Sequence, residues 1–286
     1  DCVKLAALQA SHQAIATTTL FKLALLNGLS IGGLLIGLGL LIFLVWQRIT
    51  QSKTAILTLD SNHAWSVPWN WEITCQAIVL GFFITFFVGQ TIAITLLVPT
   101  LFKWFTLDTL LPSNRLQALS LLLSYAIAAA GGLFVLYLSV EPFRPFPNDW
   151  FRWELNPKVL LWGIGGYLAA VPLVIGVSLI NQQVWQGQGG SNPILEIALQ
   201  KQDWWAIACF IATASIAAPI FEELMFRGFL LPTLTAYLPT WGAIVASSLV
   251  FAFAHLSLSE VLPLATLGIV LGVVYTRSRN LLTSML

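Results

Sequence analysis

The sequence has 286 residues, of which 58% are hydrophobic, and only 13 Lys or Arg and 12 Asp or Glu carry charge. Soluble globular chains carry charge on about a quarter of their residues, so this composition excludes a soluble, disordered or nucleic-acid-binding protein and indicates a polytopic membrane protein. The net charge of +1 predicts no polyanionic partner such as a nucleic acid, and the spacing of the three cysteines fits no disulfide framework.

The first 186 residues predict four membrane spans, because their uncharged gaps mostly exceed the roughly 20 apolar residues that cross a bilayer. A helical stretch of moderate hydrophobicity at 3–19 precedes them. The spans are expected at about 23–46, 76–99, 116–138 and 159–180. The loop after the first span contains Trp65, Trp69 and Trp71. Because indole rings favour the headgroup level, we expect this loop to rest in the membrane interface.

Glycine positions predict where these spans approach one another closely, since small residues let helix backbones meet. In the first span they form two pairs four residues apart, Gly28 with Gly32 and Gly33 with Gly37; in the fourth span they are Gly163, Gly165 and Gly166.

The rest of the chain predicts a second group of helices. A glycine-rich turn and a short surface helix are expected within 187–202, and hydrophobic helices at about 204–236, 241–256 and 260–276, with a last one beginning near Leu281. The expected fold is therefore an all-α, polytopic membrane helical bundle of about seven to eight transmembrane helices. We expect two parts: residues 1–186, which supply N-terminal membrane helices with interfacial loops, and residues 187–286, a core that holds the candidate site.

Four ionisable residues lie inside these apolar helices, namely Glu222, Glu223, Arg227 and His255. Such groups are costly in a membrane, so they indicate a functional site. Glu222 lies 16 residues before Leu238 in the turn between two helices, and His255 lies 17 residues after it. With a rise of about 1.5 Å per residue, an antiparallel hairpin brings both to one shallow depth.

The helical spacing of the charged residues also predicts which of them pair with each other. Glu223 and Arg227 are i and i+4 and share a helix face, so they are expected to pair. Glu222 is rotated by about 100° from its neighbour and stays available as a general base. Together, Glu222 and His255 can hold a water molecule or a metal ion.

Three other ways of cutting peptides in a membrane fit less well. No histidine begins an H-E-x-x-H zinc motif, and every aspartate falls outside the expected spans. Ser30 lies in a G-x-S-x-G pattern, but within a glycine-rich membrane helix rather than a strand–turn–helix elbow. A serine site with His255 would also leave Glu222 and its neighbours unexplained.

The segment from Glu222 to Gly228 (EELMFRG), followed by Phe251 to His255 (FAFAH), resembles the first two motifs of the CPBP family, E-E-x-x-x-R and F-x-x-x-H. These intramembrane proteases include the CAAX prenyl endopeptidases and bacteriocin-processing proteins. The resemblance covers about residues 187–286. Within it, the stretches 189–193 and 255–260 look most like cyanobacterial and plastid members, which implies a plasma or thylakoid membrane.

This resemblance implies an intramembrane metalloendopeptidase in which Glu222 and His255 activate the attacking water and Glu223 and Arg227 support them. Two forms of the site stay open. A zinc ion could take Glu222, Glu223 and His255 as ligands, although tetrahedral zinc usually has more nitrogen or sulfur donors; alternatively the water is activated without a metal. The family's third motif, a His followed four residues later by Asn or Asp, would lie beyond Leu286, so we expect the numbered chain to be an inactive segment of a longer protein.

The expected partners are membrane lipids, a peptide or membrane-protein substrate, and an additional membrane protein. A different class of function is a non-proteolytic scaffold or immunity-type protein that keeps the fold and binds another membrane protein through its apolar faces. A transporter is disfavoured, because no internal repeat is present.

Overall fold

The computed structural model describes residues 28–51, 55–59, 64–147, 149–186 and 203–286, and in these residues it is helical with no β-strand. Six of the described helices are long and apolar enough to cross a membrane, namely Gly28–Thr50, Trp71–Trp104, Ser113–Phe143, Pro157–Val184, Trp204–Leu234 and Leu258–Ser278. A shorter apolar helix spans Thr240–Ala254. The predicted all-α polytopic bundle is confirmed, whereas the predicted helices at 3–19 and within 187–202 lie outside the described residues.

Several spans are built from consecutive helical segments. The second consists of α2 (Trp71–Gln76), η2 (Ala77–Val88), α3 (Gly89–Ile92), η3 (Ala93–Leu97) and α4 (Val98–Trp104). The fifth consists of α9 (Trp204–Ala212), η5 (Thr213–Ala217), α10 (Ala218–Glu223), η6 (Leu224–Leu230) and α11 (Leu231–Leu234). The other elements are α5 (Leu107–Leu110), α6 (Ser113–Val140), η4 (Glu141–Phe143), α7 (Pro157–Val184), α12 (Thr240–Ala254), η7 (Leu258–Glu260), α13 (Val261–Ser278) and α14 (Leu282–Met285).

Polar caps explain where three of the spans begin. The side chains of Asn70, Asn156 and Asp203 accept hydrogen bonds from the backbone N–H groups of Ile73, Val159 and Trp205, at 3.1, 3.0 and 3.1 Å. A side-chain acceptor at the N-cap satisfies an amide that would otherwise lack a partner. The second span therefore starts about five residues before the apolar run that predicts it.

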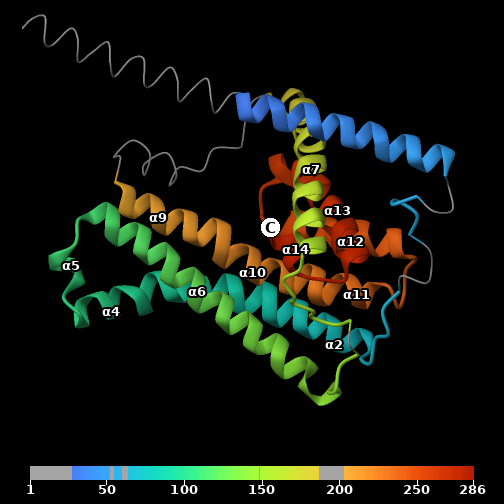
Figure 1. The fold of residues 1–286 in the computed structure, drawn as a ribbon. Helices are drawn as coiled ribbons and strands as arrows, with labels where there is room; N and C mark the ends of the chain where they lie inside the picture. The colour runs from blue at the N-terminus through green and yellow to red at the C-terminus, as the bar shows by residue number, and fades with distance from the viewer. Residues whose placement is uncertain (1–27, 52–54, 60–63, 148, 187–202) are drawn as a thin grey trace, which may run out of the picture.

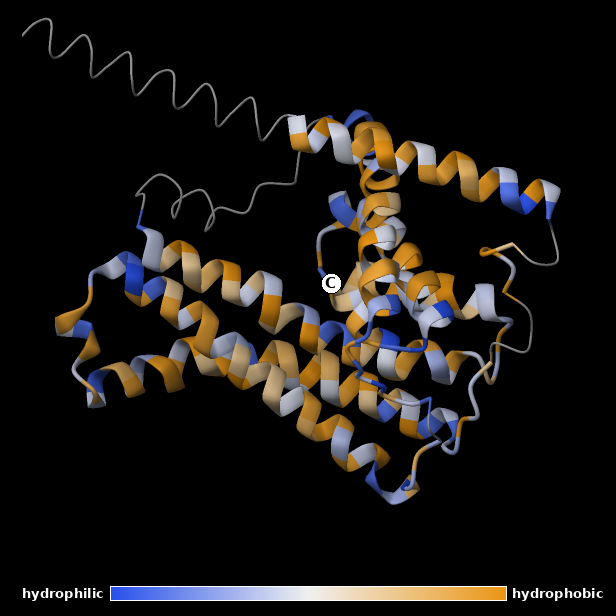
Figure 2. Cartoon of the chain, in the orientation of Figure 1, coloured by the Kyte–Doolittle hydropathy of each residue, from blue (hydrophilic) through white to orange (hydrophobic). Residues whose placement is uncertain are grey.

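The helices pack as two neighbouring groups (Figure 1). In one, α6 runs beside η2 and α9; in the other, α7 contacts both α13 and α14, and α12 contacts α13. Hydrophobic residues run along all of these helices (Figure 2), and many large ones are exposed, as expected where lipid is the solvent.

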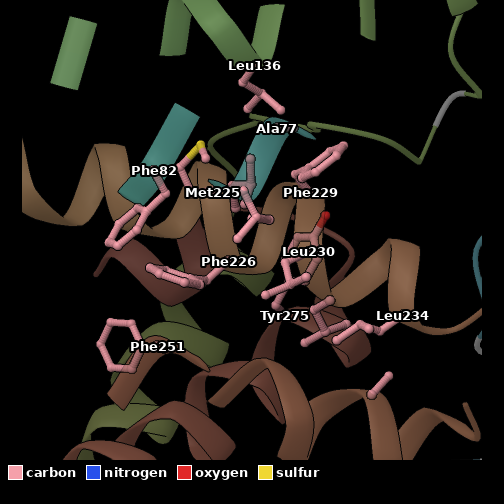
Figure 3. Packing of buried hydrophobic residues seen from close by; sticks show 14 of the residues in the cluster. Ala77, Phe82, Leu136, Met225, Phe226, Phe229, Leu230, Leu234, Phe251 and Tyr275 are labelled. Carbon is pink, nitrogen blue, oxygen red and sulfur yellow. The ribbon is translucent and has the colours of Figure 1, made fainter. Parts of the chain in front are cut away.

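One aromatic core joins the two groups (Figure 3). Phe226 on η6 is fully buried, and its ring lies 4.8 Å from that of Phe82 on η2 and 5.4 Å from that of Phe251 on α12. The core therefore includes residues from both predicted parts of the chain. The division at residue 186 itself stays a prediction.

Trp65 and Trp69 do not present their indoles to the headgroups, because both residues are only 4% exposed; the level of their loop in the membrane stays a prediction. Trp65 stacks on Tyr275 at 5.5 Å between ring centroids, and Trp69 stacks on Phe229 at 5.4 Å. The indole N–H of Trp69 also donates to the hydroxyl of Thr233 at 3.0 Å, so the polar atom of the ring is satisfied inside the protein. Only Trp71, which is 51% exposed, remains a candidate for the headgroup level.

The glycine predictions hold at some positions and fail at others. A Cβ on Gly37 would meet the backbone of Leu168 on α7, and one on Gly166 would lie 2.7 Å from a Cγ atom of Val274. By contrast, Gly28, Gly32 and Gly165 have no such neighbour within 4 Å among the described residues, so close packing at these three is wrong. The contact at Gly37 shows why the first span can lie against α7.

Candidate active site

The candidate site is built around α10, where Glu222 and Glu223 follow the buried Phe221. The Phe221 ring is 1% exposed and stacks on Phe82 and Phe86, with ring centroids 5.5 and 4.9 Å apart. These contacts fix α10 against the second span. Glu222 and Glu223 therefore occupy defined positions although they lie deep in an apolar bundle.

Glu223 and Arg227 form the ion pair that their spacing predicts. The Arg227 Nη1 atom lies 2.6 Å from Oε1 of Glu223, and the two side chains are 1% and 4% exposed. The guanidinium also lies 4.3 Å from the centre of the Phe251 ring, and its Nη2 donates to the carbonyl of Gly268 at 3.5 Å. Arg227 thus joins η6 to α12 and α13 as well as compensating the Glu223 charge.

Glu222 faces a different environment. Its Oε1 accepts a hydrogen bond of 3.5 Å from the hydroxyl of Tyr125 on α6. Both Glu222 and Glu223 line a cavity of about 250 Å³, here called the Glu222 cavity. Of the two, Glu222 is the carboxylate not held by Arg227, which is the property that a general base needs.

The walls of the Glu222 cavity come from four further helices. Gly163 and Gly166 on α7, Phe251 on α12, Val274 on α13 and Ser284 on α14 all line it. Gly163 and Gly166 leave room for this approach, since a Cβ on Gly163 would lie 2.9 Å from Cβ of Leu286. The walls are mostly apolar, so the few polar groups inside interact strongly.

His255 lies just beyond the end of α12 and outside the lining of the Glu222 cavity. Its Nδ1 lies 2.9 Å from the carbonyl oxygen of Phe251, and its ring packs on the Phe251 ring at 4.8 Å. Phe251 therefore contacts both His255 and Arg227 and connects the histidine to the acidic pair. The side chain of His255 is exposed, which suits a residue that meets water or substrate.

The metal hypothesis is not favoured by this donor set. Among the described residues, no three His, Cys, Asp or Glu side chains gather closely enough to hold one ion. Glu223 is occupied by Arg227 at 2.6 Å. Glu222, Glu223 and His255 as placed therefore do not fit a zinc centre.

Two polar residues near the carboxylates are not predicted as site residues from the sequence. Tyr125 is one of the two tyrosines on α6, the other being Tyr137, and Ser284 is buried on the short α14. The only signal for Tyr125 was a hydroxyl placed inside a membrane span. For Ser284 there was none, because contact across five helices depends on tertiary packing.

Comparison with known proteins locates the resemblance in the same part of the chain. Residues 203–286 match the family model described as type II CAAX prenyl endopeptidase Rce1-like. The resemblance to the CPBP proteases is confirmed for this segment. No curated protein and no solved structure matches the chain. The cyanobacterial or plastid branch, and with it the thylakoid membrane, stays a prediction.

The match supports a protease function of the CAAX type at the level of the family, acting on a peptide in a lipid environment. Together with the six apolar helices, it supports an integral, multi-pass membrane protein. The Rce1-like segment begins at Asp203, which caps α9 and accepts hydrogen bonds from Asn114 and Arg115 on α6. Tyr125, Gly163 and Gly166 lie outside it, so the Glu222 cavity also depends on helices that precede the matched residues.

Proposed function

We propose that this chain is the membrane-embedded core of an intramembrane endopeptidase in which Glu222 activates the attacking water. The observation that carries this proposal is the separation of the two adjacent carboxylates. Glu223 is paired with Arg227, whereas Glu222 lines a cavity of about 250 Å³ and, among the described side chains, accepts a hydrogen bond from the Tyr125 hydroxyl. An unpaired carboxylate in a largely apolar site can take up a proton from water.

The proposed reaction uses the Glu222 carboxylate and one water molecule. The Glu222 carboxylate takes a proton from the water, and the water oxygen attacks the carbonyl carbon of the scissile peptide bond. The protonated Glu222 then gives the proton to the departing nitrogen as the carbon–nitrogen bond breaks. The products are a carboxylic acid and an amine, and Glu222 returns to its starting state.

The roles of the other residues follow from their contacts. Tyr125 donates to one carboxylate oxygen and so orients the other toward the cavity. Arg227 holds Glu223 and Phe251, and Phe251 in turn packs against His255. We propose that His255 holds the water or the developing oxyanion from the α12 side, with Glu223 and Arg227 in support.

The test uses the full-length protein in liposomes and a prenylated peptide that ends in a C-a-a-X sequence, with cleavage followed by mass spectrometry. Glu222→Gln preserves size and hydrogen bonding but removes the base, so kcat should fall at least about 100-fold. Glu72→Gln is the matched control, because Glu72 is exposed at the start of α2, and it should cleave at the wild-type rate.

Equal cleavage by the wild type and the Glu222→Gln variant would refute the proposed role of Glu222. The same peptide without its prenyl group, run in parallel, determines whether the lipid modification is needed. If neither peptide is cleaved by a well-folded full-length protein, the scaffold or immunity-type alternative becomes the better account of this fold.

A further inference from the structure

A second cavity lies where α7 begins and α13 ends, and it shares no lining residue with the Glu222 cavity. Its volume is about 600 Å³. Three cationic side chains line it, Arg152, Lys158 and Arg277, and none of the described residues in its lining is acidic. We call it the basic cavity.

The walls of the basic cavity are held by hydrogen bonds between distant parts of the chain. The amide of Leu281 donates to the carbonyl of Arg152 at 3.0 Å, and the side-chain amide of Asn280 donates to the carbonyl of Glu154 at 2.6 Å. Nη2 of Arg277 donates to the carbonyl of Ala55 at 3.1 Å. The cavity is therefore a built feature of the fold rather than a gap between loose loops.

Cationic side chains outnumber the described acidic ones around the basic cavity. Glu154 is the acidic residue that meets one of its cations, at 2.6 Å from Nη2 of Arg152, and both side chains of that pair are exposed. The nearby Asp149 is paired with Arg279 at 2.7 Å. Within the part of the chain that the structure describes, the lining itself holds three cations and no carboxylate, which favours an anion.

Its level in the membrane follows from the helices that form it. Lys158 stands in the first turn of the span Pro157–Val184, and Arg277 in the last turn of the span Leu258–Ser278. Both therefore lie where these helices leave the hydrocarbon. Trp162, whose residue type favours this level, forms part of the wall.

Apolar surface adjoins the basic cavity on the membrane side. Leu161 is 74% exposed and Ile164, three residues later on α7, is 57% exposed. Residues three apart share a helix face, so these side chains form a continuous apolar strip from the cavity toward the bilayer interior. A ligand with an anionic head and a hydrocarbon tail would contact both surfaces.

We propose that the basic cavity binds the phosphate group of an anionic phospholipid, whose acyl chains lie along Leu161 and Ile164. Basic pockets between transmembrane helices bind anionic headgroups in other membrane proteins. Free phosphate carries the same group, but it would make no use of the apolar strip. The site is separate from the Glu222 cavity and does not depend on the proposed protease activity.

The test measures binding of phosphatidylglycerol and phosphatidylcholine to the purified full-length protein in detergent by native mass spectrometry. Phosphatidylglycerol should bind more tightly than zwitterionic phosphatidylcholine. Lys158→Gln should weaken the binding of phosphatidylglycerol about fivefold, which is the effect of removing one cation near a charged lipid surface. Lys103→Gln is the matched control, because Lys103 is also an exposed lysine at the end of an apolar span but lies outside the cavity.

Inorganic phosphate, added as a competitor, separates the two sources of the anion. Displacement of the lipid by phosphate supports recognition of the phosphate group alone, whereas lipid that stays bound to wild type but is lost from Lys158→Gln supports recognition of the intact phospholipid. A Leu161→Ser variant should weaken lipid binding and leave phosphate binding unchanged. The proposal is overturned if Lys158→Gln and Lys103→Gln weaken phosphatidylglycerol equally, or if phosphatidylcholine binds as tightly.

Discussion

The buried Glu223–Arg227 pair makes a sharp prediction about stability. Arg227→Met keeps most of the apolar stem and removes the charge, which leaves Glu223 buried at 4% side-chain exposure without its 2.6 Å partner. Oε2 of Glu223 already has no hydrogen-bond partner among the described residues. Breaking a buried pair from one side costs about 3–5 kcal/mol, so Arg227→Met should lower the free energy of unfolding by that amount.

Glu223→Leu should lower the free energy of unfolding less than Arg227→Met does, because the Arg227 side chain has other partners besides Glu223. In Glu223→Leu the guanidinium keeps the Gly268 carbonyl and the face of Phe251, whereas in Arg227→Met the carboxylate loses its ion-pair partner at 2.6 Å. The double variant Glu223→Leu with Arg227→Met removes both charges, and replacing a whole buried pair by apolar residues is often neutral or stabilising. The expected order of stability is double variant, then Glu223→Leu, then Arg227→Met.

The assay is equilibrium unfolding in mixed detergent, followed by tryptophan fluorescence and repeated for all four members of the double-mutant cycle. Arg227→Lys serves as a control that keeps the charge but loses the planar fork. If Arg227→Met costs less than about 1 kcal/mol, or if the double variant is as unstable as Arg227→Met, the pair is not the buried, mutually compensating unit described above.

Two further predictions concern packing and the start of the fifth span. Gly268→Ala should lower the free energy of unfolding by about 1–3 kcal/mol, because its Cβ would lie 2.8 Å from Cβ of Ser248 on α12; Gly165→Ala, which meets no neighbour within 4 Å, is the control in a thermal unfolding assay. The Arg115 guanidinium lowers the pKa of Asp203, with smaller contributions from Asn114 and backbone amides, so the ionised form stabilises the fold above about pH 4. Asp203→Asn keeps a capping side chain but should lose this contribution, and its Tm deficit should shrink as the pH falls below that value.

Each of these predictions has an outcome that contradicts it. Equal Tm values for Gly268→Ala and Gly165→Ala would mean that α12 and α13 can separate at no cost. A Tm difference between wild type and Asp203→Asn that does not change between pH 7 and pH 3 would mean that the Arg115 contact contributes nothing through charge. High salt should reduce the difference as well, since the Arg115 side chain is 40% exposed.

Features that depend on nearby residues could be predicted from the sequence. The membrane spans follow from uncharged runs, and the Glu223–Arg227 pair follows from i, i+4 spacing, because both depend on positions a few residues apart. Hairpin geometry predicts one depth for Glu222 and His255, but depth does not specify which way a side chain faces. His255 turns its Nδ1 to the Phe251 carbonyl instead of lining the Glu222 cavity.

Features that depend on distant partners could not be predicted in the same way. Composition alone assigns an indole to the headgroup level, yet Trp69 has a better partner in Thr233, 164 residues away. Tyr125 reaches Glu222 across 97 residues of sequence. Such contacts arise when helices with unrelated sequence patterns pack together, so no local pattern indicates them.

The close contact of Gly163 with Leu286 has a consequence for how this protein can change over evolution or by engineering. The Rce1-like residues 203–286 depend on the fourth span at this point, because Leu286 occupies space that α7 provides only by lacking a side chain at Gly163. Exchanging that segment for one from another protein would require a matching gap in the recipient's fourth span. The two sequences must therefore vary together, and a chimaera is expected to fail first at the α7–α14 contact, well before any chemistry is affected.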